Sequence, residues 1–233
     1  MTSLSRRRFL VLTAGFGMAG AVSPGFTEGM PAIARWQGIA LGSAASITLA
    51  HPDGKRVLDR VLAEISRLER VFSLYRTDSA LSQPNREGCL TDPPFELVEC
   101  LGLAGSLHRA TDGAFEPTIQ PLWAAYAEAH SAGRDPTASE LETARQRTGW
   151  RRVSVEAGRI TLGDGMAITL NGIAQGFIAD KVAGVLTAGG VSDVMIDTGE
   201  LRAVGGRPDG GDWTVTLDGG RGTVPLRNRA LST

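Results

Sequence analysis

Residues 169–180, with the sequence TLNGIAQGFIAD, are the most informative stretch of this chain. An apolar run at 166–170 predicts a strand before it, and a helical pattern extends beyond it to about residue 188. Asn171 is a favourable N-cap, and Gly172 and Gly176 are predicted to share one face of the first helical turns. Such a face lets a phosphate approach unpaired backbone N–H groups. Alternatively, the two glycines only allow the helix to pack closely on a sheet.

Around this stretch, helical and strand patterns are mixed without strict strand–helix–strand alternation. Helices are expected at 55–72 with Asp53 as a candidate cap, from 92–94 to Gly113, and from a capping box of Thr137 and Glu140 to Gly149. Strands are expected at 36–50 with an interruption near Gly42, in two pieces around 157–158, and at 193–197, 201–204, 213–217 and 223–226. This order predicts an α+β fold of mixed, largely antiparallel sheets with packed helices.

The N-terminal region is typical of an export signal. Residues 5–10 read SRRRFL, and a short apolar segment then extends to residue 22. That segment is shorter than the roughly 18–20 apolar residues that span a bilayer. Small residues at 19–21 resemble a cleavage site, and the paired arginines indicate the twin-arginine route, which carries folded proteins. We therefore expect a signal peptide at 1–21, a linker at 22–35, a domain at 36–233, and a periplasmic protein without stable membrane insertion.

Charge and cysteine content exclude some classes of function. The chain carries 24 basic and 25 acidic residues, and three of the arginines lie in the expected signal peptide, so nothing favours nucleic-acid binding. Cys89 and Cys100 either pair in an oxidising compartment or remain thiols. The three histidines, at 51, 108 and 130, have dissimilar surroundings and are expected at the surface. No HExxH or Ser-His-Asp arrangement is present.

Two loops place aromatic side chains after helical segments. In residues 72–82, FSLYRTDSALS, Tyr75 can stack on a flat ring and Arg76 can pair with an acid or phosphate. The other interpretation is a capped loop with a half-buried tyrosine. In residues 111–118, TDGAFEPT, Ala114 and Phe115 are apolar loop residues beside which a ligand ring can lie. Alternatively, Phe115 only fixes this loop to the core.

A third loop, DTGE at 197–200, ends a buried-looking strand in a tight turn. Turns of this kind often contact ligands, which makes Thr198 and Gly199 candidate binding residues. The alternative is an ordinary hairpin connection.

These segments, in this order, resemble the ApbE-type FAD:protein FMN transferases. The shared elements are the FSxYRxDSxLS loop, the TDGAFxPT turn, the GIAxG helix start and the turn at 197–200. The resemblance covers nearly all of residues 36–233. The variants LNGIAQGF and IDTGE are most similar to the branch that assists periplasmic nitrous-oxide reductase, which is thought to flavinylate a membrane-bound electron-transfer partner.

The resemblance implies an enzyme that moves FMN from FAD to a threonine of an acceptor protein and releases AMP. It also implies a magnesium ion, with the Gly172 carbonyl as one ligand. The FAD contacts it implies are Leu41, Tyr75, Ala114, Phe115, Glu116, Thr169 and Gln175. The family often has aspartate at the positions of Thr169 and Glu116 and lysine at that of Gln175. Thr169 carries no charge and Gln175 cannot offset phosphate charge as lysine would, whereas glutamate at 116 is a smaller change.

Residues 230–233 resemble the start of a family segment that continues for on the order of a hundred residues. We expect that continuation to hold an HxIDP region and the aspartate and threonine that complete the magnesium site. This sequence is therefore expected to be a C-terminally truncated domain. No general base is evident in it. Two other functions remain open, a non-catalytic flavin-binding accessory protein and a periplasmic binding module unrelated to flavin.

Overall fold

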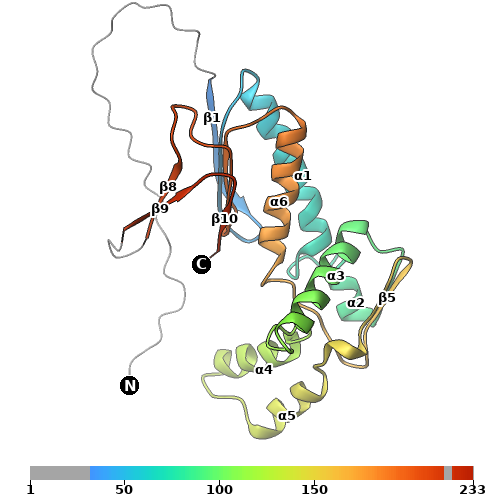
Figure 1. The fold of residues 1–233 in the computed structure, drawn as a ribbon. Helices are drawn as coiled ribbons and strands as arrows, with labels where there is room; N and C mark the ends of the chain where they lie inside the picture. Colours follow the sequence, from blue (N-terminus) through green and yellow to red (C-terminus); the bar gives the residue numbers. More distant parts are fainter. Residues whose placement is uncertain (1–31, 218–221, 233) are drawn as a thin grey trace, which may run out of the picture.

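The computed structural model describes residues 32–217 and 222–232. The expected signal peptide lies outside this part of the chain. The described residues form two lobes joined by one hydrophobic core (Figure 1). The first lobe contains a five-stranded sheet, two long helices and a two-stranded hairpin. The second lobe contains four further α-helices and a three-stranded sheet.

The five-stranded sheet of the first lobe is antiparallel throughout, in the order β1-β2-β6-β7-β10. Its strands are β1 (Ile33–Ala40), β2 (Ser43–Ala50), β6 (Val194–Asp197), β7 (Leu201–Val204) and β10 (Ala230–Leu231). Buried residues alternate along β2 and β6, as expected for a sheet with one face on the core. The interruption predicted near Gly42 is confirmed, because Leu41 and Gly42 form the turn between β1 and β2. The first strand begins three residues before the predicted start.

Helices α1 (Gly54–Phe72) and α6 (Ala174–Ala188) cover one face of this sheet (Figure 1). In α1, Leu58, Val61, Ile65 and Leu68 recur at helical spacing and are buried in the core. The hairpin of β8 (Trp213–Thr216) and β9 (Thr223–Leu226) packs on the opposite face through a second apolar cluster. Among the described residues, no helix is both long enough and apolar enough to cross a bilayer.

The second lobe contains α2 (Ser82–Glu87), α3 (Phe95–Ala110), α4 (Gln120–Ser131), α5 (Ala138–Gln146) and the short 3-10 helix η1 (Trp150–Arg152). Its sheet joins β3 (Cys89–Thr91), β5 (Arg159–Thr161) and β4 (Ser154–Glu156) in that order. The capping box of Thr137 and Glu140 is confirmed, although α5 ends at Gln146 and not at Gly149. The mixed, antiparallel α+β fold is confirmed as well.

Three predictions about secondary structure are wrong or incomplete. Residues 166–170 are extended and bury alternate side chains, but they are not a strand. The side-chain amide of Asn85 accepts a hydrogen bond from Ile168 N and donates one to Ile168 O, at 2.7 and 2.8 Å, in place of a neighbouring strand. The sequence analysis also missed α2 and α4. The signal for α4 was Pro121 in the first turn of an alanine-rich run.

Two ion pairs hold α3 of the second lobe on the helices of the first. Arg67 on α1 bonds to Glu96 at 2.5 Å, and Lys181 on α6 bonds to Glu99 at 2.6 Å. The remote end of α3 leads into the loop that contains Phe115 and Glu116. The position of this loop relative to the first lobe therefore depends on α3.

Candidate flavin nucleotide site

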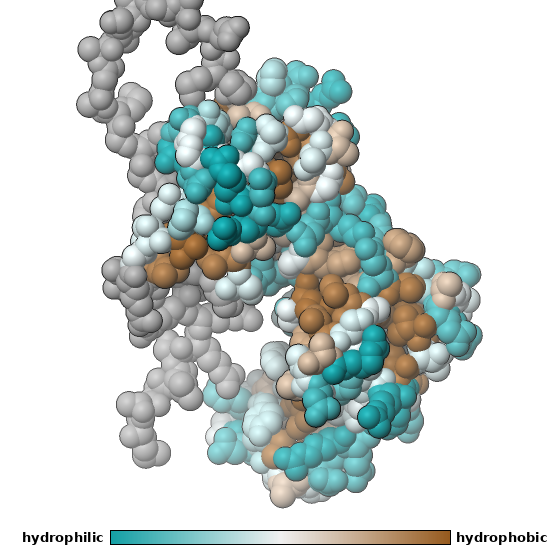
Figure 2. Space-filling model, in the orientation of Figure 1, coloured by the Kyte–Doolittle hydropathy of each residue, from teal (hydrophilic) through white to brown (hydrophobic). Residues whose placement is uncertain are grey.

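The candidate binding residues lie within the segment 169–176 and in loops next to it. This segment runs from the extended stretch into α6, near the notch between the lobes that Figure 2 shows. One group of candidates comes from the first lobe and comprises Leu41, Tyr75, Gln175, Thr198 and Gly199. The other comes from the loop after α3 and comprises Ala114, Phe115 and Glu116. Thr169 and Gly172 lie between the two groups.

The turn between β1 and β2 is an unusual backbone feature of the first group. Leu41 has φ +55° and Gly42 has φ +74°. The Leu41 N–H donates to Glu69 Oε1 at 2.6 Å. The Tyr75 ring lies close to the turn, with an edge carbon 3.9 Å from the point where a Cβ on Gly42 would stand. Tyr75 is 78% exposed, so the half-buried alternative is wrong and the ring is free to stack on a ligand.

The turn between β6 and β7 lies next to Gln175 of α6. A Cβ on Gly199 would be 2.8 Å from the Gln175 amide nitrogen, and that nitrogen donates to Ser43 Oγ at 3.4 Å. Thr198 is fully buried, and among the described residues its hydroxyl has no hydrogen-bond partner. Burial raises the pKa of the Asp197 carboxyl, although the Gly199 N–H bond opposes this shift. A buried polar hydroxyl and a disfavoured carboxylate make this turn a candidate functional site.

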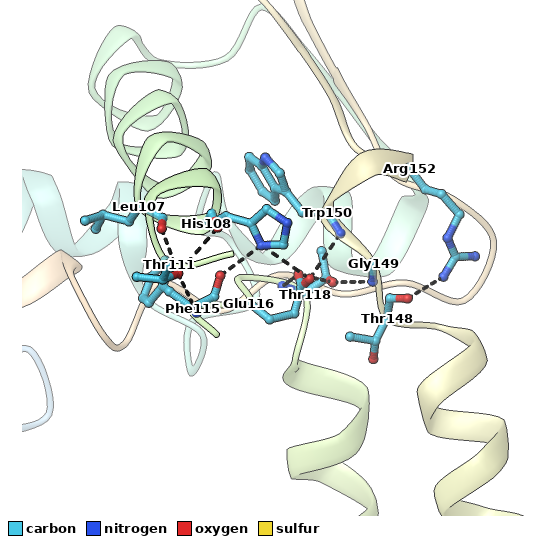
Figure 3. Close-up of polar contacts among 10 residues, drawn as sticks. All are labelled: Leu107, His108, Thr111, Phe115, Glu116, Thr118, Thr148, Gly149, Trp150 and Arg152. Carbon is cyan, nitrogen blue, oxygen red and sulfur yellow. Dashed lines mark hydrogen bonds and ion pairs between the residues drawn. The ribbon is translucent and has the colours of Figure 1, made fainter. Parts of the chain in front are cut away.

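In the second group, Glu116 is the centre of a polar network (Figure 3). Its Oε1 accepts bonds from the N–H and the hydroxyl of Thr118, at 2.9 and 2.5 Å, and its Oε2 accepts one from Trp150 N at 3.3 Å. The Thr118 hydroxyl in turn accepts a bond from Gly149 N at 2.7 Å. Glu116 therefore ties the loop after α3 to the start of η1, and its carboxylate is already satisfied by the protein.

His108 belongs to the same network, and the expectation that it is a surface residue is wrong. Its Nδ1 lies 2.9 Å from the Phe115 carbonyl oxygen and 3.6 Å from Glu116 Oε2, and its side chain is 17% exposed. Because the Phe115 oxygen can only accept, Nδ1 carries the proton in this contact. The sequence analysis also missed Thr118, Trp150, Ser43 and Glu69. The bonds that bring them into the site join residues 28 or more positions apart, which no local pattern indicates.

Replacing Thr118 with valine is expected to lower the free energy of unfolding by about 2–3 kcal/mol. Valine keeps the shape of this fully buried side chain, but it leaves Gly149 N without its acceptor and removes one of the two hydrogen bonds that Glu116 Oε1 accepts. Thr118→Ser is the matched control, because it keeps the hydroxyl and loses only a methyl group. Urea unfolding followed by circular dichroism measures both. Equal destabilisation by the two variants would show that packing matters here and hydrogen bonding does not.

The glycine face predicted at the helix start is present only in part. Helix α6 begins at Ala174 with Ile173 as N-cap, so the prediction of Asn171 as the cap is wrong, and Gly172 precedes the helix. A Cβ on Gly172 would be 3.1 Å from the Phe115 ring, whereas one on Gly176 would meet none of the described side chains within 4 Å. Phe115 thus fills the space at Gly172. The helix start is open at Gly176, where a phosphate can reach the first turn.

The described residues do not form a magnesium site on their own. Among them, no three histidine, cysteine or acidic side chains gather as metal ligands. The Gly172 carbonyl offers one oxygen, whereas Mg²⁺ usually takes one or two carboxylates together with phosphate and water.

The two cysteines are not paired. Cys89 is partly exposed in β3 and Cys100 is buried in α3. Burial raises the pKa of the Cys100 thiol to about 12, so this thiol is neutral at physiological pH. Of the two interpretations of the sequence, the structure supports free thiols.

Fold and site together define an α+β protein of two lobes, with candidate binding residues from both lobes near the start of α6. The model of the ApbE family matches residues 41–233, and the chain belongs to this family. An FAD:protein FMN transferase of Vibrio cholerae is 29% identical over 169 residues, which are 69% of this chain and 49% of that protein. One from Chlamydia trachomatis is 24% identical over 97% of this chain and 72% of its own length.

Solved structures agree with the family assignment. The apo form of the flavinyl transferase ApbE from Pseudomonas stutzeri superimposes with a TM-score of 0.76 at 26% identity, over 87% of this chain and 70% of that one. The apbe protein from Thermotoga maritima has a TM-score of 0.76 at 21% identity and shows the shared fold. The chain spans about half the length of several curated relatives that it matches.

Proposed function

We propose that this protein transfers FMN from FAD to a threonine side chain of an acceptor protein and releases AMP. The observation that carries the proposal is the convergence of the candidate residues. Segment 169–176 contacts the loop of Phe115 through Gly172 and the β6–β7 turn through Gln175. One dinucleotide can therefore touch both groups. The family membership and the names of the relatives support the same conclusion.

The proposed reaction is attack on a phosphorus atom of the FAD pyrophosphate. The threonine oxygen forms a bond to the phosphorus of the FMN half, the bridging bond to AMP breaks, and the hydroxyl proton passes to a base. Negative charge on the phosphoryl oxygens is the main obstacle. The N–H groups of the first turn of α6, at the positive end of its dipole, would offset this charge beside Gly176.

The other residues are assigned to holding and orienting FAD. The exposed Tyr75 ring is placed to stack on a flat ring, and Phe115 presents a second apolar surface next to Gly172. Glu116 positions the Phe115 loop through the Thr118 and Trp150 contacts, because both of its oxygens are occupied. Mg²⁺ is included in the proposal with the Gly172 carbonyl as one ligand, and when bound it would neutralise phosphate charge.

We further propose a periplasmic location and export by the twin-arginine route. The arginine pair and short apolar segment within residues 5–22 support this proposal. The proposed acceptor is a membrane-bound electron-transfer protein of a nitrous-oxide reductase system. The sequence variants LNGIAQGF and IDTGE support that choice. Fractionation of cells that produce the protein, with and without Arg6→Lys and Arg7→Lys, tests the route.

Incubation with FAD, Mg²⁺ and a soluble acceptor fragment is expected to give covalent flavin fluorescence in a denaturing gel and one AMP per label. A fragment whose target threonine is replaced by valine is the matched control and is expected to remain unlabelled. FAD binding without any label or AMP would contradict the transferase and favour the non-catalytic flavin-binding protein. Absence of FAD binding would contradict both functions.

A further inference from the structure

The turn at Leu41 and Gly42 has a backbone that its sequence does not favour. Two-residue turns with positive φ at both positions prefer asparagine, aspartate or glycine at the first one. Leucine with φ +55° is a rare and strained conformation for a residue with a Cβ. Such conformations persist where surrounding contacts hold them, and they concentrate at functional sites.

The contact that holds this turn comes from Glu69, in the last turn of α1. Its Oε1 accepts the Leu41 N–H at 2.6 Å, a short hydrogen bond to a partly buried carboxylate. The backbone oxygen of the same residue accepts the N–H of Ser73 at 3.0 Å, where α1 ends and the Tyr75 loop begins. Glu69 is thus bonded to the β1–β2 turn through its side chain and to the start of the Tyr75 loop through its main chain.

The position of this turn affects other candidate residues. The Tyr75 ring lies beside Gly42. Ser43 directly follows the turn, and its hydroxyl accepts a bond from the Gln175 amide and reaches the Thr198 carbonyl oxygen, both at 3.4 Å. A displacement of the turn would therefore change the surroundings of Tyr75, Gln175 and Thr198 together.

We propose that Glu69 is a positioning residue for the flavin nucleotide site. Its carboxylate holds the Leu41–Gly42 turn in the positive-φ conformation that places Gly42 beside the Tyr75 ring. Glu69 does this through the Leu41 N–H and without touching the ligand. This inference rests on the proposed function and assigns a role within the same site.

The experiment compares Glu69→Ala with Glu69→Gln, which keeps the accepting oxygen. Asp59→Ala is the matched control, because Asp59 is an exposed carboxylate on α1 paired only with Lys55 among the described residues. Amide hydrogen exchange at Leu41, read by NMR in the ligand-free protein, is expected to accelerate at least about tenfold in Glu69→Ala. Little change is expected in the other two variants.

Titration with FAD is the second measurement. The dissociation constant is expected to rise at least about tenfold in Glu69→Ala and less than about threefold in Glu69→Gln and Asp59→Ala. In a Leu41→Gly background, Glu69→Ala is expected to cost less affinity, because glycine takes positive φ without a holding contact. A direct contact of Glu69 with FAD would instead give the same loss in both backgrounds.

The outcomes separate this inference from the proposed function. Unchanged Leu41 exchange in Glu69→Ala overturns the holding role whether or not FAD binds. Normal FAD affinity in Glu69→Ala, with the wild type binding FAD, overturns the positioning role alone. Failure of the wild type to bind FAD overturns the proposed function and with it the positioning role. Equal losses in the alanine and glutamine variants would also contradict a role for the accepting oxygen.

Discussion

Gly176→Ala is expected to weaken FAD binding at least about tenfold while making the protein more stable, and this pair of opposite effects tests the site most directly. Among the described residues, a Cβ at Gly176 would meet nothing within 4 Å outside the adjacent turns of its own helix, so alanine fits without strain. Within α6 it should raise the free energy of unfolding by up to about 1 kcal/mol. The same methyl group would stand between the phosphates and the N–H groups of the first turn.

Gly184→Ala is the matched control, since Gly184 lies in the same helix and its Cβ would also be unobstructed. It should stabilise α6 to a similar extent and leave FAD affinity unchanged. Isothermal titration with FAD and thermal unfolding measure the two effects. If both variants bind FAD as the wild type does, the phosphates do not lie against this end of α6, and the site must be placed elsewhere.

Gly205→Ala is expected to have the largest effect on stability, at least about 3 kcal/mol, enough to prevent folding in a marginally stable domain. Gly205 follows β7 with φ +59°, and a Cβ there would lie 1.9 Å from the Ser192 carbonyl oxygen. That oxygen belongs to the backbone just before β6, so it cannot rotate away. This contact can be relieved only if the ends of β6 and β7 move apart.

Gly210→Ala separates the cost of a positive φ from the cost of the close contact with Ser192. Gly210 also has positive φ, but a Cβ there would meet none of the described residues within 4 Å. It should therefore show only the backbone cost, about 1–2 kcal/mol. Soluble yield and urea unfolding compare the variants. A Gly205→Ala protein as stable as Gly210→Ala would show that the approach of Ser192 is easily relieved.

The sequence predicted those parts of the fold that depend on short-range patterns. The hairpin break near Gly42, the amphipathic α1, the capping box at Thr137 and the strands around 157–158 all follow from residues within a few positions of each other. The motif order also indicated the family, which the family model confirms. The individual binding contacts remain predictions, because their test is a bound ligand.

Other features could not be predicted, because they depend on partners distant in the chain. The side-chain amide of Asn85 bonds to the backbone of Ile168, 83 positions away, where a neighbouring strand would otherwise bond. Residues 166–170 therefore form an extended segment and not the strand that their alternating apolar pattern predicts. The Phe115 ring occupies the space at Gly172 that local reasoning left for a phosphate.

The amino-acid sequence by itself determined most element types, the α+β class and the family, because hydrophobic periodicity, capping residues and turn glycines act over a few positions. Only the tertiary structure decided which polar groups meet. It placed Glu69 against Leu41 and brought His108, Glu116 and Thr118 into one network with Gly149. The physical reason is that a buried donor or acceptor must find a partner, and packing of the whole chain determines which group is within 3 Å.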